Sequence, residues 1–116
     1  MPNKNFSITV SSAFGAFHSH DKTLSEPLHR HDFKYDITLR ASLNEEGYIE
    51  DFRKVEDLLK KINVKLEGRN LNEILPLPTT ENLAYYIFRE VKKVFPSAVR
   101  ITLREKENYS ASYEES

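Results

Sequence analysis

The sequence contains no cysteine. Disulfide bonds, thiolate metal ligands and thiol nucleophiles are therefore excluded, and histidine and carboxylate side chains remain as the credible metal ligands. The formal net charge is only -1, so the composition gives no basic surface of the kind that binds nucleic acid. The longest apolar runs are far too short to span a membrane. No secretory signal peptide precedes the first strand-like run, and we expect a cytoplasmic protein.

The chain of 116 residues is long enough for one domain with a modest core. Its composition, 39% hydrophobic and 30% charged, is ordinary for a globular protein. There is no internal repeat and no low-complexity segment. We therefore expect residues 1–116 to form a single domain.

The periodicity of apolar residues predicts the element order β-β-α-α-β-β. Two strands are expected near the N-terminus, through residues 6–10 and 31–43, separated by a long polar loop at 15–27. Two more are expected at 98–105 and 109–113. The first helix should begin after Asp51 as N-cap, and the second after Pro78, capped by Thr79 or Thr80. Their apolar stripes are Val55, Leu58, Leu59 and Ile62, and Leu83, Ala84, Ile87, Phe88, Val91, Val94 and Phe95.

Each predicted helix has one apolar stripe, and an antiparallel sheet has one face to cover. An α+β fold, with two helices on one face of a four-stranded antiparallel sheet, satisfies both requirements. The edges of so small a sheet stay open, so they are either protected or paired with another subunit.

Two histidines one residue apart open the most regular strand. His29 and His31 project to the same face because side chains at i and i+2 of a strand point the same way. Two converging imidazoles are half of a zinc site, and a hairpin would bring His18 or His20 beside them as a third ligand. The alternative is that the pair is simply solvated at the start of the strand.

Glu105 is a second unusual residue. It shares parity with Val99, Ile101 and Leu103, so it should point toward the apolar face, where an unpaired carboxylate is costly. A ligand that donates two N–H groups would pair with it. The alternative is that the strand ends at Leu103 and leaves Glu105 in solvent.

Six short motifs in the correct order resemble the 6-pyruvoyltetrahydropterin synthase family, which includes 6-carboxytetrahydropterin synthase. The resemblance covers nearly the whole chain. The motifs are FGAFH (14–18), LHRH (28–31), GYIEDF (47–52), LEGRNLN (66–72), PTTENLA (78–84) and REKENYSASY (104–113). Their family counterparts are F-x-A-A-H, L-H-G-H, G-M-V-x-D-F, L-D-H-x-x-L-N, P-T-x-E-N-L-A, and an E-T run followed by A-x-Y.

The resemblance implies the tunnelling fold, in which subunits join sheets edge to edge into a barrel, usually as trimers stacked into hexamers. It implies that zinc is bound by His18, His29 and His31, with His20 left at the surface. It also implies that Glu105 anchors the pterin ring. Thr79 and Thr80 would lie near the pterin across a subunit boundary.

The departures from the family pattern concern proton transfer. Ser25 stands where the family has its catalytic cysteine, and Glu67 and Gly68 stand where it has an Asp-His dyad. A serine hydroxyl is a far weaker acid than a thiol and does not simply replace it. Glu26, next to Ser25, and Glu67 are the candidate catalytic residues, because a carboxylate near zinc can serve as acid or base. The alternative for Glu26 is an ordinary loop carboxylate in water.

The leading hypothesis is a zinc-dependent pterin lyase acting on 7,8-dihydroneopterin or its triphosphate. The products would be 6-pyruvoyl, 6-carboxy or, by aldolase-like cleavage, 6-hydroxymethyl pterin. A non-catalytic pterin- or purine-binding homologue is the alternative, and a purely structural oligomer is a third possibility. The expected partners are a small-molecule pterin and further copies of the chain, in a trimer or hexamer.

Overall fold

A computed structural model describes residues 6–19 and 28–116 of the chain. The strands are β1 (Phe6–His18), β2 (His29–Ala41), β3 (Ala98–Lys106) and β4 (Tyr109–Glu114). Two helices, α1 (Phe52–Leu66) and α2 (Thr80–Val94), and a short 3-10 turn, η1 (Leu71–Glu73), lie between β2 and β3. The predicted order and the α+β class are confirmed.

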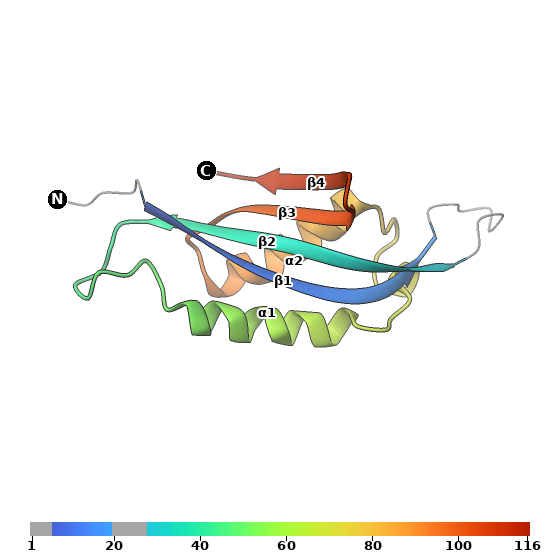
Figure 1. Cartoon of the computed structure of the whole chain (residues 1–116), viewed down its shortest axis with the longest axis horizontal. Helices are drawn as coiled ribbons and strands as arrows, with labels where there is room; N and C mark the ends of the chain where they lie inside the picture. The colour runs from blue at the N-terminus through green and yellow to red at the C-terminus, as the bar shows by residue number, and fades with distance from the viewer. Residues whose placement is uncertain (1–5, 20–27) are drawn as a thin grey trace.

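The four strands form one antiparallel sheet in the order β1-β2-β3-β4, so each strand pairs with its neighbour in sequence. Both helices lie on the same face of this sheet (Figure 1). Helix α1 packs on β1, and α2 packs on β3 and β4. The layered arrangement expected from the apolar stripes is confirmed.

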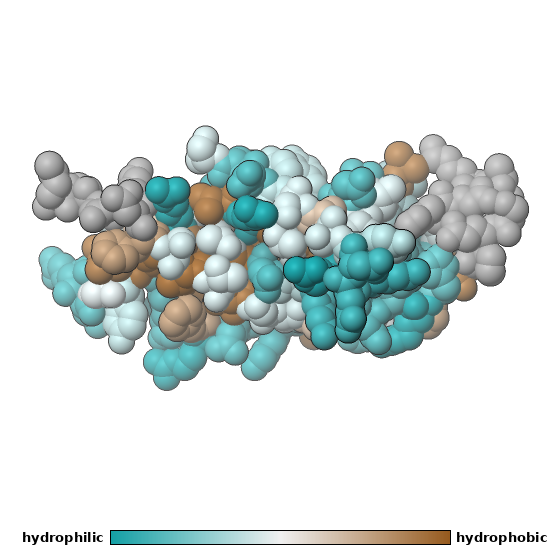
Figure 2. Space-filling view, turned by 45° about the horizontal axis from the view of Figure 1, so that its top comes forward, coloured by the Kyte–Doolittle hydropathy of each residue, from teal (hydrophilic) through white to brown (hydrophobic). Residues whose placement is uncertain are grey.

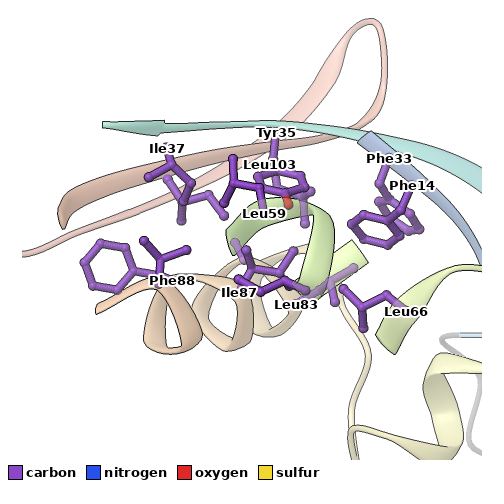
Figure 3. Packing of buried hydrophobic residues seen from close by; sticks show 14 of the residues in the cluster. Phe14, Phe33, Tyr35, Ile37, Leu59, Leu66, Leu83, Ile87, Phe88 and Leu103 are labelled. Carbon is purple, nitrogen blue, oxygen red and sulfur yellow. The ribbon is translucent and has the colours of Figure 1, made fainter. Parts of the chain in front are cut away.

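The core lies between the sheet and the helices (Figure 3). Alternate residues of β2 supply one side of it, and α1 and α2 supply the other. The buried side chains labelled in Figure 3 are Phe14, Phe33, Tyr35, Ile37, Leu59, Leu66, Leu83, Ile87, Phe88 and Leu103. Tyr35 is buried with its hydroxyl satisfied, because it donates to Asn63 Oδ1 at 2.7 Å, and Asn63 in turn donates to Ser12.

Both helix starts follow from local sequence. The Asp51 side chain accepts a hydrogen bond from the Arg53 backbone N–H, and the Thr79 side chain accepts one from that of Asn82. These contacts satisfy backbone donors that the first helical turn leaves without partners. Asp51 and Thr79 are therefore the N-caps, and Thr80 is the first helical residue of α2.

The first two strands differ from their predicted bounds. Strand β1 runs on to His18, although a loop was expected from Gly15, because Gly15, Ala16 and Phe17 continue the ladder opposite Asp32, His31 and Arg30. Strand β2 begins at His29 and ends at Ala41 rather than running from His31 to Leu43. The hairpin is thus longer than expected, and the histidines lie inside it.

One core assignment was also wrong. Val94 was placed in the apolar stripe of α2, but it is 55% exposed because the helix ends there and the following residue, Phe95, turns inward instead. Figure 2 shows one face of the molecule, on which hydrophilic and intermediate residues lie beside smaller hydrophobic areas. Among the described residues, no helix is long and apolar enough to cross a membrane.

Candidate metal centre

Three imidazoles meet where β1 ends and β2 begins. His18 and His29 are direct cross-strand partners, and His31 follows two residues later on the same face of β2. The ring centroids lie 5.0 Å apart for His18 and His29, 4.8 Å for His18 and His31, and 4.4 Å for His29 and His31. The convergence expected from strand parity is therefore present, with His18 as the third member.

Glu105 reaches the same cluster from β3. Its Oε1 atom lies 3.0 Å from His31 Nε2 and 3.3 Å from His18 Nε2. The ladder between β3 and β4 shifts register between Arg104 and Lys106, so Glu105 occupies an irregular position of the kind that re-aims a side chain. Since β3 continues to Lys106, the alternative in which the strand ends at Leu103 is wrong.

The cluster is largely shielded from solvent. The His18 side chain is fully buried, and those of His31 and Glu105 are 12% and 14% exposed. Burial lowers the pKa of His31; the Glu105 carboxylate opposes this shift, and the neighbouring His18 and His29 add to it. A depressed pKa favours the neutral imidazole, which is the form that binds a metal ion.

His18 is held from behind by the loop that leads into α2. Its Nδ1 atom lies 3.0 Å from the Pro78 carbonyl oxygen. Because a carbonyl only accepts, Nδ1 carries the hydrogen, and Nε2 faces His31 and Glu105 as an acceptor. A backbone carbonyl on the second ring nitrogen is the usual way in which a metal-binding histidine is oriented.

The backbone after His18 is fixed by Asn72, to which the sequence analysis assigned no role. The Asn72 side chain accepts a hydrogen bond from Ser19 N–H at 2.9 Å and donates one to Ser19 O at 2.9 Å. One amide side chain thus pairs with both backbone groups of the residue next to His18. The only indication in the sequence was that Asn72 closes the LEGRNLN motif.

The donor set fits a transition-metal ion. His18, His29, His31 and Glu105 each offer one ligand atom, and these atoms all lie within 4.8 Å of one another. The His31 Nε2 atom is buried and makes no hydrogen bond to residues 6–19 or 28–116. Imidazole nitrogen and carboxylate oxygen are the ligands that Zn²⁺ accepts in the absence of cysteine, and three histidines are a common set for a catalytic ion.

The two threonines of the PTTENLA motif make different hydrogen bonds. Thr80 donates from its hydroxyl to Glu105 Oε2 at 2.8 Å within the same chain. Its predicted position near a pterin across a subunit boundary stays a prediction. Thr79 uses its hydroxyl oxygen as the cap of α2. The structure therefore brings Thr80 into the cluster of its own chain and gives Thr79 a local structural contact.

Glu67 lies at the edge of β1. Its Oε1 atom accepts a hydrogen bond from Gly15 N–H at 3.1 Å, and its Oε2 atom lies 3.5 Å from Arg30 Nη2. The backbone continues this edge contact, because Gly68 N–H donates to Gly15 O and Phe17 N–H donates to Arg69 O. These contacts join Glu67 to the strand edge, not to the imidazoles.

Three further residues singled out in the sequence, His20, Ser25 and Glu26, fall in the segment 20–27, outside the described residues. The described part of the predicted site therefore divides in two. His18, His29, His31, Glu105 and Thr80 form one cluster, and Glu67 lies at a separate position.

The sheet covered on one face by two helices is a fold that this chain shares with solved structures of known proteins. It aligns with 6-pyruvoyl tetrahydropterin synthase from Caenorhabditis elegans at a TM-score of 0.84 and 21% identity, over 96% of each chain. It aligns with the Plasmodium vivax synthase, solved as an alanine mutant of a catalytic glutamate, at a TM-score of 0.78 and 16% identity, over 95% of this chain and 97% of that one. At such identities these likenesses establish the fold.

Sequence comparison establishes the family. The family profile described as 6-pyruvoyl tetrahydropterin synthase matches residues 7–116. A dihydroneopterin monophosphate aldolase from Pyrococcus furiosus is 32% identical over 94 residues, which are 81% of this chain and 82% of that protein. The chain belongs to the 6-pyruvoyl tetrahydropterin synthase family, and the predicted resemblance is confirmed.

Proposed function

We propose that the chain is a zinc-dependent pterin lyase that cleaves the side chain of 7,8-dihydroneopterin or one of its phosphates. The observation that carries this proposal is the meeting of His18, His29 and His31, with His18 buried and oriented by Pro78. In this account the three histidines hold the ion, which supplies a Lewis acid for an oxygen of the substrate side chain.

Glu105 and Thr80 form the part of the site assigned to the pterin ring. A carboxylate can accept two parallel N–H bonds, from the ring nitrogen and the amino group of a pterin. The Thr80 hydroxyl already orients one oxygen of that carboxylate at 2.8 Å. Because the site is largely closed to water, such charge-assisted bonds would contribute more than they would at the surface. Thr79 contributes to the proposed site by capping the start of α2, the helix on which Thr80 lies.

We favour aldol-type cleavage over the synthase reactions. The family's cysteine and dyad histidine are replaced here by Ser25 and Gly68. Gly68 has a φ of 71° and contributes its backbone N–H to the edge of β1, so this position serves as a turn. The relative from Pyrococcus furiosus, named as an aldolase on the monophosphate, supports the same choice.

The proposed reaction needs a proton acceptor and a proton donor. A base removes the proton of the C2′ hydroxyl, the C1′–C2′ bond breaks, and the electron pair left on C1′ is conjugated with the dihydropterin ring until C1′ is protonated. The products are 6-hydroxymethyl-7,8-dihydropterin and glycolaldehyde, or its phosphate, and no oxidant is consumed. Glu26 and Glu67 are the candidate groups for these transfers.

Different observations support Glu26 and Glu67 as the residues that transfer protons. Glu26 neighbours the position of the family's cysteine, and a catalytic glutamate is known from the Plasmodium vivax protein. Glu67 contacts Gly15 and Arg30 at the edge of β1. Proton transfer by Glu67 would therefore require a substrate bound beside this strand edge. We therefore place Glu26 first and Glu67 second.

We also propose a homo-oligomer, a trimer or hexamer, formed by pairing of sheet edges. Strands β1 and β4 are the two ends of the sheet, and residues 67–72 cover only the part of β1 from Gly15 onward. Exposed strand edges favour pairing with another chain. A single domain over 1–116 and a cytoplasmic location remain part of this proposal.

A non-catalytic pterin- or purine-binding protein is the second candidate, favoured by the replacements at Ser25 and Gly68. The test is incubation of zinc-loaded protein with 7,8-dihydroneopterin, its monophosphate and its triphosphate, followed by identification of the pterin and aldehyde products. We expect 6-hydroxymethyl-7,8-dihydropterin together with glycolaldehyde or its phosphate. Tight pterin binding without any product would establish the second candidate instead.

A further inference from the structure

The Glu105 carboxylate lies beside the histidine cluster, at a distance from His18 and His31 that is expected between two ligands of one metal ion. We infer that Glu105 is the fourth ligand of the ion when no pterin is bound, and that the pterin displaces it. This inference rests on the proposed function, because it takes His18, His29 and His31 as the metal-binding residues. It adds a ligand exchange that controls access to the ion.

The spacing of the donor atoms is the first argument. Two ligands bound at about 2.0–2.1 Å to one tetrahedral zinc ion are roughly 3.3–3.4 Å apart. Glu105 Oε1 lies 3.3 Å from His18 Nε2 and 3.0 Å from His31 Nε2. The carboxylate oxygen therefore already lies at about the spacing of a second ligand from two of the three imidazoles, those of His18 and His31.

The orientation of the carboxylate is the second argument. Thr80 binds Oε2 and thereby directs Oε1 toward the imidazoles. The side chain is only 14% exposed and leaves β3 at the register shift, so solvent competes little for Oε1 while no pterin is bound. A ligand held in this way loses less conformational entropy when it binds a metal ion.

The two roles of Glu105 exclude each other. Pairing with the two N–H groups of a pterin needs both carboxylate oxygens, and a bond to the ion needs one of them. A site with four protein ligands is closed, whereas a catalytic zinc site keeps one position for water or substrate. Binding of the pterin ring to Glu105 would therefore open that position when the side chain to be cleaved arrives.

The first test measures metal affinity by competition with a chelator. We expect Glu105→Gln to weaken Zn²⁺ binding by at least about 100-fold, because even supporting residues around metal ligands cost about 10–100-fold. Thr80→Val, which removes only the orienting hydroxyl, should show a smaller loss of about tenfold. Glu107→Gln is the matched control, since this exposed carboxylate follows two residues later, and it should match the parent.

The second test reads the coordination of the ion directly. Protein loaded with Co²⁺ should change its visible absorption when neopterin is added, because the ligand set changes. Glu105→Gln should differ from the parent before any pterin is present. Circular dichroism and thermal unfolding of each variant show whether it is folded, and Thr80→Val provides a milder variant should Glu105→Gln fail to fold.

The outcomes separate the two proposals. If Glu105→Gln binds Zn²⁺ as tightly as Glu107→Gln and its Co²⁺ spectrum equals that of the parent, the ligand exchange is overturned while the three-histidine site stands. If the Co²⁺ spectrum of the parent does not respond to bound neopterin, displacement is overturned. If the parent binds no metal ion, both this inference and the proposed function are overturned.

Discussion

The Nδ1 atom of His18 lies 3.0 Å from the carbonyl oxygen of Pro78, 60 residues further along the chain. This hydrogen bond joins the end of β1 to the residue just before the cap of α2. It fixes the ring so that Nε2 faces the other imidazoles and Glu105. The start of α2 thus positions both His18, through Pro78, and Glu105, through Thr80.

The first prediction concerns Asn72, whose amide holds Ser19 next to His18. Asn72→Ala removes two hydrogen bonds to the Ser19 backbone, so the end of β1 should be less well fixed. We expect Zn²⁺ affinity, measured by chelator competition, to fall by about 10–100-fold.

Asn44→Ala is the matched control for Asn72. The Asn44 side chain also makes two backbone hydrogen bonds, to the N–H groups of Glu46 and Tyr48, but it follows the opposite end of β2. It should destabilise its turn without changing metal affinity. Equal Zn²⁺ affinities of Asn72→Ala and Asn44→Ala would contradict a supporting role for Asn72.

The second prediction concerns the buried hydroxyl of Tyr35. Burial raises the pKa of Tyr35 to about 12, and the nearby Ser12 hydroxyl only partly opposes this shift. The unfolded chain, with a pKa near its ordinary value of about 10, gives up the proton first as pH rises. The folded state then binds more protons than the unfolded state, so stability falls between about pH 10 and pH 12.

Tyr35→Phe isolates this effect. At pH 8 the substitution should cost about 1 kcal/mol or more, because the Asn63 amide loses its partner in the interior. Between pH 8 and pH 11.5 the free energy of unfolding of the parent should fall by about 1–2 kcal/mol more than that of Tyr35→Phe. Denaturant titrations of both proteins at each pH measure the difference, and parallel pH profiles would refute the assignment.

The third prediction separates binding from chemistry. Glu26→Gln keeps the size and hydrogen bonding of the side chain but cannot exchange a proton near neutral pH. It should bind neopterin almost as the parent does and lose about 10²–10⁴-fold in turnover. Glu67→Gln is measured beside it. If Glu26→Gln turns over like the parent, Glu26 is not catalytic, and a loss confined to Glu67→Gln would move the role to Glu67.

The fourth prediction concerns assembly. Because β1 and β4 are the ends of the sheet, pairing of edges between chains should give a trimer or hexamer in multi-angle light scattering. A stable monomer at micromolar concentration would rule out the barrel. Activity would then have to arise within a single chain.

Much of the fold follows from the sequence because the spacing of apolar residues differs between strands and helices. The alternation from Phe33 to Leu39 and the stripe from Leu83 to Val91 specify a strand and a helix without help from the rest of the chain. The hairpin bounds were missed because residues 15–18 were grouped with the polar segment that follows them in the sequence. Only cross-strand pairing, such as that of His18 with His29, keeps residues 15–18 in the sheet.

The sequence predicted those parts of the site that depend only on which face of a strand each side chain occupies. Strand parity brought His29 and His31 together and turned Glu105 inward. Contacts between distant segments could not be inferred in this way. Asn72 with Ser19, Pro78 with His18 and Glu67 with Gly15 each depend on how the loops after α1 pack against β1, and no local pattern encodes that packing.

The central claim is that His18, His29 and His31 hold a metal ion in a pterin-processing site. The most direct measurement is the zinc content, by elemental mass spectrometry, of the purified parent and of the variant with all three histidines replaced by alanine. Circular dichroism confirms that the variant is folded. We expect one zinc ion per parent chain and none in the variant, whereas full zinc occupancy in the variant would contradict the account.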